Sequence, residues 1–159
     1  MKTFAELRTA VLEKTVSSLA HIADRRGRSS VPVHLRTGAE GEDAVFFYLR
    51  RNGYIVVARR WTSGDRPGDI DLIAWKGQVL CFIEVKTRTA EDMTPAEAAV
   101  DWHKRNVLRR LASQYVRQLP QQERPPVRFD VVSVYLLPGV AKKFVHFENA
   151  FGWDERRID

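Results

Sequence analysis

Two acidic residues and one lysine interrupt stretches of the chain that are otherwise apolar. Asp71 lies within Gly68-Asp69-Ile70-Asp71-Leu72-Ile73, while Glu84 and Lys86 lie within Phe82-Ile83-Glu84-Val85-Lys86-Thr87. Charged groups in such surroundings lower stability unless they serve a ligand or a reaction. Carboxylate oxygens, water and substrate phosphate oxygens are the ligands that Mg²⁺ prefers. The three residues therefore predict metal-assisted cleavage of a phosphodiester bond, with Mg²⁺ or Mn²⁺ as cofactor.

Each of these residues has a predicted role. Asp71 and Glu84 supply carboxylate ligands, and the main-chain carbonyl of Val85 supplies another. Lys86, which shares a strand face with Glu84 by alternation, orients the attacking water or stabilises charge on the phosphate. The alternative is a solvated strand face, because Glu-x-Lys often carries only a weak surface ion pair. The apolar run directly before Glu84, and Asp71 thirteen positions earlier, favour the catalytic interpretation.

How Asp71 and Glu84 lie relative to each other depends on the turn between their strands. A two-residue turn at Lys76-Gly77 would pair Asp71 with Phe82, diagonal to Glu84 on the same face. A four-residue loop would pair Asp71 with Glu84 directly. A three-residue loop without a bulge would send Asp71 to the opposite face. The Lys-Gly dipeptide favours the short turn.

The surrounding pattern predicts one α/β domain over residues 37–159. A helix is expected over 40–52, with Val45, Phe46 and Leu49 inward and Gly53 as its stop. The capping box at 94–97 predicts a second helix that runs to Gln118, with Val107, Leu108, Leu111 and Tyr115 inward. Five strands complete the domain: a central strand over 54–58, strands over 69–75, 79–87 and 129–136, and an edge strand over 143–147. The expected order is helix, three strands, helix, two strands, with a loop over 61–68 and a tail at the end.

Residues 1–36 are predicted to form an N-terminal helical extension and linker. Apolar residues recur at roughly helical spacing over 3–24, and the stretch 28–36, with Pro32, is typical of a linker. These residues carry seven Lys/Arg against three Asp/Glu, most of the surplus of a chain whose formal net charge is +6. An oligomer contact and a DNA-binding arm are alternatives between which the pattern does not decide.

Composition limits the class of protein. Cys81 is the only cysteine, which excludes an internal disulfide and argues against a cysteine-ligated zinc site. No apolar run is long enough to cross a bilayer, and Glu6 and Glu13 interrupt any secretory signal, so we expect a cytoplasmic protein without a membrane partner. The basic balance suits a polyanionic partner such as nucleic acid.

Basic and aromatic side chains supply candidate contacts to that partner. Lys104, Arg105, Arg109 and Arg110 form a stripe on the second helix, opposite its apolar face, and the pattern alone favours an ordinary solvated face. The tryptophans could stack on unpaired bases, although packing is the favoured role for each. The residues predicted to contact phosphates are Arg59, Arg60, Arg66, Arg88, Lys104 and Arg105.

Taken in order, the motifs resemble the bacterial YraN family, over about residues 38–152. They are Gly41-Glu42, Tyr48-Leu49, Gly53-Tyr54, Gly68 to Ile73, Ile83 to Arg88, Arg128 to Val132 and Ala150-Phe151. The core is also similar to that of archaeal Holliday-junction resolvases. Position 69 is Asp where the family usually has Glu, and the N-terminal extension lies outside the family core.

This resemblance implies a restriction-endonuclease-like fold, with a central mixed sheet flanked by helices. It implies a DNA endonuclease whose catalytic residues are Glu42, Asp71, Glu84 and Lys86. Branched or damaged DNA is the candidate substrate, with DNA favoured over RNA. Glu42 lies at the edge of the inward helix face, where the helix dipole alone would also favour an acid. Enzymes that cut both strands usually pair two sites, and by this analogy we expect a homodimer.

Two other classes of function stay open at this level. One is a non-catalytic nucleic-acid-binding or partner-scaffolding module that keeps the nuclease fold. The other is a protein-interacting module in which the N-terminal helix makes the oligomer contact.

Overall fold

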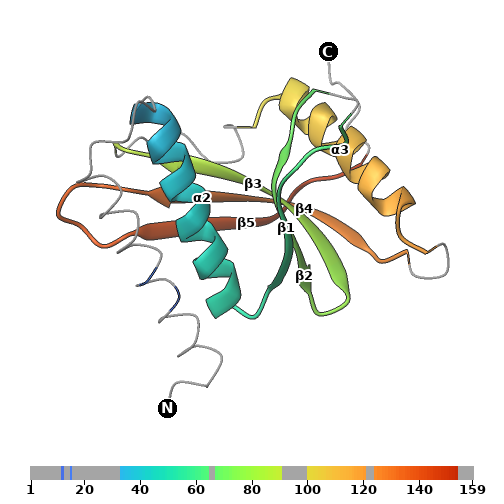
Figure 1. Cartoon of the computed structure of the whole chain (residues 1–159), viewed down its shortest axis with the longest axis horizontal. Helices are drawn as coiled ribbons and strands as arrows, with labels where there is room; N and C mark the ends of the chain where they lie inside the picture. Colours follow the sequence, from blue (N-terminus) through green and yellow to red (C-terminus); the bar gives the residue numbers. More distant parts are fainter. Residues whose placement is uncertain are drawn as a thin grey trace.

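The computed structural model describes residues 33–64, 67–90, 100–120 and 124–153, together with Leu12 and Thr15. Its elements follow the order helix, three strands, helix, two strands, as expected. They are α2 (Val33–Arg51), β1 (Ile55–Trp61), β2 (Ile70–Lys76), β3 (Val79–Arg88), α3 (Trp102–Arg117), β4 (Val127–Tyr135) and β5 (Lys143–Phe151) (Figure 1). The α/β fold class is confirmed.

The strands form one mixed sheet in the order β1-β2-β3-β4-β5. β3 and β4 run parallel, and the other three neighbouring pairs run antiparallel. α3 lies in the connection between the two parallel strands, which need a long crossover. This arrangement is consistent with a restriction-endonuclease-like core.

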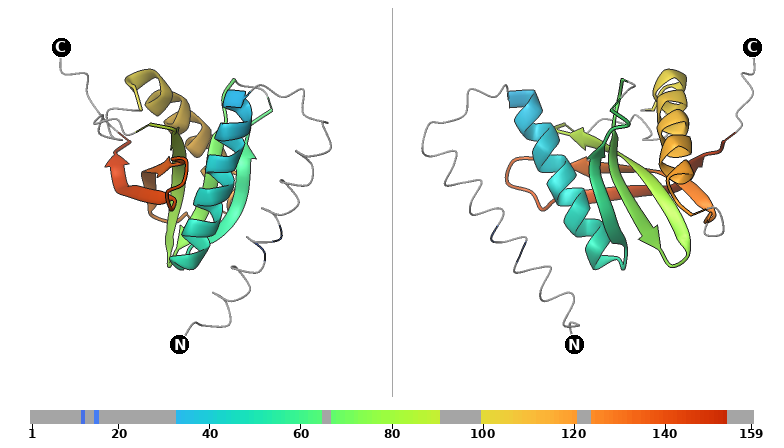
Figure 2. Two further views of the ribbon diagram at one scale, coloured as in Figure 1. Left: turned by 90° about the vertical axis from the view of Figure 1, so that its left-hand side faces the viewer. Right: turned by 45° about the vertical axis from the view of Figure 1, so that its right-hand side comes forward.

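The two helices cover opposite faces of the sheet, so β3 is buried on both sides (Figure 2). Leu108 and Leu111 of α3 pack with Phe82 in one apolar cluster. Val45 and Leu49 of α2 pack in the other cluster, on the opposite face of the sheet. Each such buried side chain contributes about 1.5–3 kcal/mol to stability. The double burial explains why the β3 sequence is almost continuously apolar before its acidic residue.

Two helix starts differ from the prediction. α2 begins at Val33, so residues 33–36 of the expected linker are helical. The division into an extension and a domain at residue 36 stays a prediction, because residues 3–24 lie outside the described residues apart from Leu12 and Thr15.

α3 begins after Asp101, whose side chain accepts a hydrogen bond from the Lys104 main-chain N–H at 2.8 Å. The prediction of one continuous helix from Thr94 to Gln118 is therefore wrong. The predicted capping box at 94–97 lies outside the described residues.

The edges of the sheet also differ from the prediction. β1 is an edge strand and not a central one, with the Ile55 side chain 67% exposed. An apolar run does not by itself reveal whether another strand pairs with it. At the other edge, β5 is confirmed as an edge strand but continues to Phe151, into the expected tail. No helix among the described residues is long and apolar enough to span a membrane.

Candidate functional site

The β2–β3 turn places Asp71 opposite Glu84. Lys76 pairs with Val79, so the two-residue turn is Gly77-Gln78, and Gly77 takes the positive φ of 58° that such a turn requires. The ladder ends at the pair Leu72 and Ile83, and the next residues in that register are Asp71 and Glu84. The expected turn at Lys76-Gly77 is therefore wrong by one residue. The resulting register pairs Asp71 directly with Glu84, an arrangement that was expected only for a four-residue loop.

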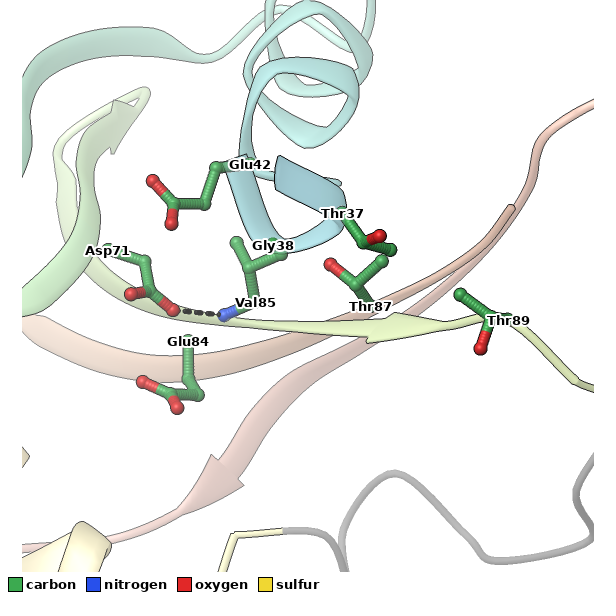
Figure 3. Close-up of a pocket in the computed structure, with 8 residues that line it drawn as sticks. All are labelled: Thr37, Gly38, Glu42, Asp71, Glu84, Val85, Thr87 and Thr89. Carbon is green, nitrogen blue, oxygen red and sulfur yellow. Dashed lines mark hydrogen bonds between the residues drawn. The ribbon is translucent and has the colours of Figure 1, made fainter. Parts of the chain in front are cut away.

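Both residues line a pocket of about 830 Å³ that also includes the start of α2. In Figure 3 the Asp71 carboxylate points to the Val85 N–H, and the Glu84 side chain points away from α2. Glu42 enters it from α2, Asp71 from β2, and Glu84 from β3. The pocket is lined by Thr37, Gly38, Glu42, Asp71, Glu84, Val85, Thr87 and Thr89. The structure thus brings together the three predicted acids and Val85.

Asp71 is anchored to the main chain of β3. Its Oδ2 accepts a hydrogen bond from the Val85 N–H at 2.7 Å (Figure 3). In an extended strand the N–H and C=O of one residue point to the same side, so the Val85 carbonyl also faces the Asp71 side. This orientation is compatible with the predicted ligand role of that carbonyl.

The Asp71 carboxyl group is electrostatically unfavourable in its charged form. Burial raises its pKa to about 7, and the neighbouring Glu84 carboxylate adds to the rise. The Val85 N–H and the Lys104 ammonium oppose the rise without cancelling it. Near neutral pH this group therefore favours a proton or a cation beside it.

Glu84 is almost fully buried, and its carboxylate forms ion pairs with two lysines. The Lys86 Nζ donates to Oε1 at 2.9 Å, and the Lys104 Nζ lies 3.1 Å from Oε2. Burial lowers the pKa of Lys104, but the Glu84 and Asp71 carboxylates outweigh burial and leave it raised. Lys104 was predicted as a phosphate contact on a basic stripe of the second helix, whereas the structure places it in the acidic cluster, next to Asp69 as well.

Glu42 is held at the pocket wall by Arg60. The Arg60 Nε and Nη2 lie 2.6 and 3.1 Å from the two carboxylate oxygens of Glu42, whose side chain is 15% exposed. The backbone of Arg60 has a φ of 47°, a region that non-glycine residues seldom adopt. Gly41 lets α2 approach β3 here, because a Cβ at this position would lie 1.8 Å from the Thr87 Oγ1.

Lys104 and Arg60 are the predicted phosphate contacts that lie among the acids. Arg59 forms an ion pair with Asp43 on α2, and Arg88 ends β3. Arg105 lies over the Phe151 ring, at 5.5 Å from its centroid. Arg66 lies outside the described residues.

The donor set fits one kind of metal site. Glu84 Oε2 is buried and lies 3.1 Å from the Lys104 Nζ, so a cation that binds here would share this oxygen with Lys104 or displace it. Among the residues that the structure describes, no three or more His, Cys, Asp and Glu side chains gather as a metal cage. Two carboxylates and a carbonyl suit Mg²⁺, which usually keeps several waters and binds substrate phosphates. They do not suit a metal that needs an all-protein cage.

Two features of this region were not predicted from the sequence. Thr87 and Thr89 line the pocket at alternate positions after Val85, a spacing that strand alternation could have revealed. Thr37 could not have been found, because its residue type and position suggested only the end of a linker.

The second feature is a buried ion-pair network around Asp130 of β4, which is fully buried. Asp130 lies 2.8 Å from the Arg128 Nε, and it contacts the His146 Nε2 at 3.0 Å and the Asn149 N–H at 2.9 Å. Burial raises its pKa, but these hydrogen bonds and the Arg128 charge outweigh burial and lower it. An acid within an apolar strand was the available signal.

Comparison with known proteins agrees with the resemblance seen in the motifs. Residues 41–134 match the model of an uncharacterised protein family, UPF0102. A UPF0102 protein of Koribacter versatilis is 52% identical over 105 residues, which cover 66% of this chain and 72% of the relative. One from Solibacter usitatus is 44% identical over 76% of this chain and 89% of the relative. Another, from Porphyromonas gingivalis, is 40% identical over 74% and 85%.

These relatives carry no described activity in their names, so they establish ancestry and not a reaction. The family match covers more than half of the chain and includes Glu42, Asp71, Glu84 and Lys86. The chain therefore belongs to the uncharacterised protein family UPF0102, also called the YraN family.

Proposed function

We propose that the protein is a divalent-metal-dependent DNA endonuclease that hydrolyses phosphodiester bonds at the Asp71–Glu84 pocket. The observation that carries this proposal is the meeting of the half-buried Asp71 carboxylate and the buried Glu84 carboxylate beside two lysines. Such a cluster lowers stability unless a cation or substrate compensates it. Family membership supports the same residues without defining a reaction.

Asp71, Glu84 and the Val85 carbonyl would hold Mg²⁺ or Mn²⁺. When bound, the ion would help to ionise an attacking water and neutralise charge on the phosphate and leaving oxygen. The Lys86 ammonium, positioned by its hydrogen bond to Glu84, orients the water or donates to a phosphate oxygen. Glu42, fixed by Arg60, faces the pocket from α2 and can hold a water or take up its proton.

Metal binding can be tested apart from catalysis. Mg²⁺ and Mn²⁺ are titrated calorimetrically into the wild type and into the Asp71→Asn/Glu84→Gln variant, which preserves side-chain size. Binding that disappears only in the variant supports the site, and DNA cleavage should then disappear with Asp71→Ala or Glu84→Ala while folding persists. Cleavage that survives in both alanine variants would overturn the assignment.

A non-catalytic nucleic-acid-binding module is the second candidate. Its specific support is that a lysine already lies against each oxygen of Glu84, so the carboxylate charge is compensated without a metal. In this case DNA binding is tight and salt-sensitive, and no product forms with either metal. If the enzyme cuts both strands, we propose a homodimer, which sedimentation in the presence of DNA would detect.

A further inference from the structure

The four tryptophans fall into two groups. Trp61 contacts the Tyr115 ring edge-on, with centroids 5.3 Å apart, and Trp75 packs against the same apolar cluster. By contrast, Trp102 is 55% exposed and Trp153 is 42% exposed. Packing accounts for the first pair. It does not account for two large aromatic side chains left in contact with water.

A pair of arginines lies between the two exposed tryptophans. Positions 102, 105 and 109 share one face of α3, because they are three and seven residues apart. Arg105 and Arg109 both lie over the Phe151 ring, at 5.5 and 5.4 Å from its centroid. The Arg109 Nε also donates to the Gly152 carbonyl at 2.8 Å, one residue before Trp153. We call Trp102, Arg105, Arg109 and Trp153 the aromatic–arginine surface; Phe151 is buried beneath the two arginines.

Contacts to the core hold this surface in place. Trp153 meets the buried Phe129 edge-on at 4.9 Å, and Phe129 stacks on Phe151 at the same centroid separation. The Arg105 Nε donates to the Val100 carbonyl at 2.8 Å. Side chains that are already ordered lose little conformational entropy when a ligand binds. The hydrogen bond from Arg109 to the Gly152 carbonyl joins α3 to the chain just after β5, and the end of β5 passes α3 in the right-hand view of Figure 2.

We propose that the aromatic–arginine surface binds unpaired bases of a nucleic acid strand. Every base has a flat face that stacks on an exposed aromatic ring, and arginines beside the rings attract the phosphates. A duplex hides its base faces within the stack, so single-stranded regions are the matching ligand. The net charge of +6 favours a polyanion over a neutral protein partner.

The surface and the acidic cluster both include residues of the first turn of α3. Trp102 precedes Lys104 by two residues, which is about 3 Å along the helix axis, and the two side chains leave the helix on different sides. Lys104 in turn reaches Glu84 at 3.1 Å. Resting on the proposed function, the inference is that the substrate has a single-stranded segment next to the bond that is cut.

Intrinsic fluorescence of the full chain provides the test. An oligothymidylate and a blunt DNA duplex are titrated separately in EDTA, so that no metal site contributes. The oligothymidylate should quench the exposed indoles and bind more tightly than the duplex. Trp102→Ala should weaken its binding by about 5- to 150-fold, the range expected for one lost stack. Trp102→Phe keeps a ring and should retain most of the affinity with a smaller fluorescence change.

Ile55→Ala is the matched control, since Ile55 is 67% exposed on the distant edge strand β1 and should not affect binding. Equal affinity of wild type and Trp102→Ala, or equal binding of duplex and single strand, would overturn the proposal. If the Trp153→Ala variant fails to fold because it loses the Phe129 contact, the affinity of the Trp102→Ala variant alone tests the proposal. The calorimetric experiment tests the pocket separately, so either proposal can fail while the other stands.

Discussion

The half-buried Asp71 and the fully buried Asp130 are two aspartates of the same sheet with opposite electrostatics. Burial and the Glu84 charge raise the pKa of Asp71 to about 7. The pKa of Asp130 is lowered, because hydrogen bonds from His146 and Arg128 outweigh its burial. The difference shows that burial alone does not identify a functional acid. A carboxylate with its charge satisfied holds the fold together, whereas one beside a like charge is ready for a ligand.

The largest effect should come from breaking the satisfied network. Asp130→Ala leaves Arg128 and the Asn149 N–H without their buried acceptor, and we expect the free energy of unfolding to fall by about 3–5 kcal/mol. Urea denaturation measures the loss. Glu148→Ala is the control: Glu148 also pairs with Arg128, at 2.8 Å, but its side chain is 54% exposed, so the loss should be about 1 kcal/mol or less. Equal losses in the two variants would contradict the structural role of Asp130.

Close packing of α2 on the pocket gives the next effect. Gly41→Ala puts a Cβ against Thr87, and we expect a loss of about 1–3 kcal/mol in unfolding free energy. Gly38→Ala lies one turn earlier with nothing within 4 Å, so it should stabilise the helix by about 0.5–1 kcal/mol. Thr87→Ala should recover part of the Gly41→Ala loss in a double-mutant cycle. Thermal or urea unfolding of the four variants is sufficient, and no recovery would mean that Gly41 serves another purpose.

The pH dependence of stability should separate the two aspartates. Because the folded pKa of Asp71 lies near 7, above its ordinary value of 3.8, the native state holds a proton that the unfolded state releases. Wild-type stability should therefore fall as pH rises from about 4 to 7. Asp71→Asn removes this slope and should be about 1–2 kcal/mol more stable than the wild type at pH 8. Parallel stability curves for the two proteins would contradict the raised pKa.

Asp130 should behave in the opposite way. Its lowered pKa stabilises the native state above the ordinary pKa of an aspartate, and this contribution disappears as pH falls through the folded value. The Asp71→Asn variant keeps Asp130, so its unfolding free energy should still fall at acid pH. This fall serves as a reference when its stability curve is compared with that of the wild type.

The smallest effect should come from one lysine of the pocket. Lys86→Ala leaves Lys104 on Glu84, so we expect a loss of about 1 kcal/mol or less in unfolding free energy. Removing both lysines leaves the buried carboxylate uncompensated, and the loss should approach about 3 kcal/mol. Chemical denaturation near neutral pH measures both. A large loss from Lys86→Ala alone would show that Lys104 does not compensate Glu84.

Local patterns predicted much of this protein. Alternation placed Glu84 and Lys86 on one strand face, and helical spacing identified Leu108 and Leu111 as core residues of α3, which are both buried. The element order followed from runs of apolar residues separated by glycine and proline. Such features depend only on neighbours in the chain, so the sequence suffices to predict them.

Other features depend on contacts between distant residues. The turn lies one residue later than expected, and this shift places Asp71 opposite Glu84. β1 is an edge strand because, among the described strands, β2 alone pairs with it. Lys104 was predicted to lie on a basic stripe opposite the apolar face of its helix, as a phosphate contact, but in the structure it reaches Glu84.

The residue types of the acidic cluster, and their placement on adjacent strands, were thus determined by the sequence itself. Which carboxylate is compensated, which lysine compensates it and which tryptophans stay exposed were decided only by the tertiary structure. The physical reason is that charge interactions and burial depend on distances across the fold, and neither can be read from spacing along the chain.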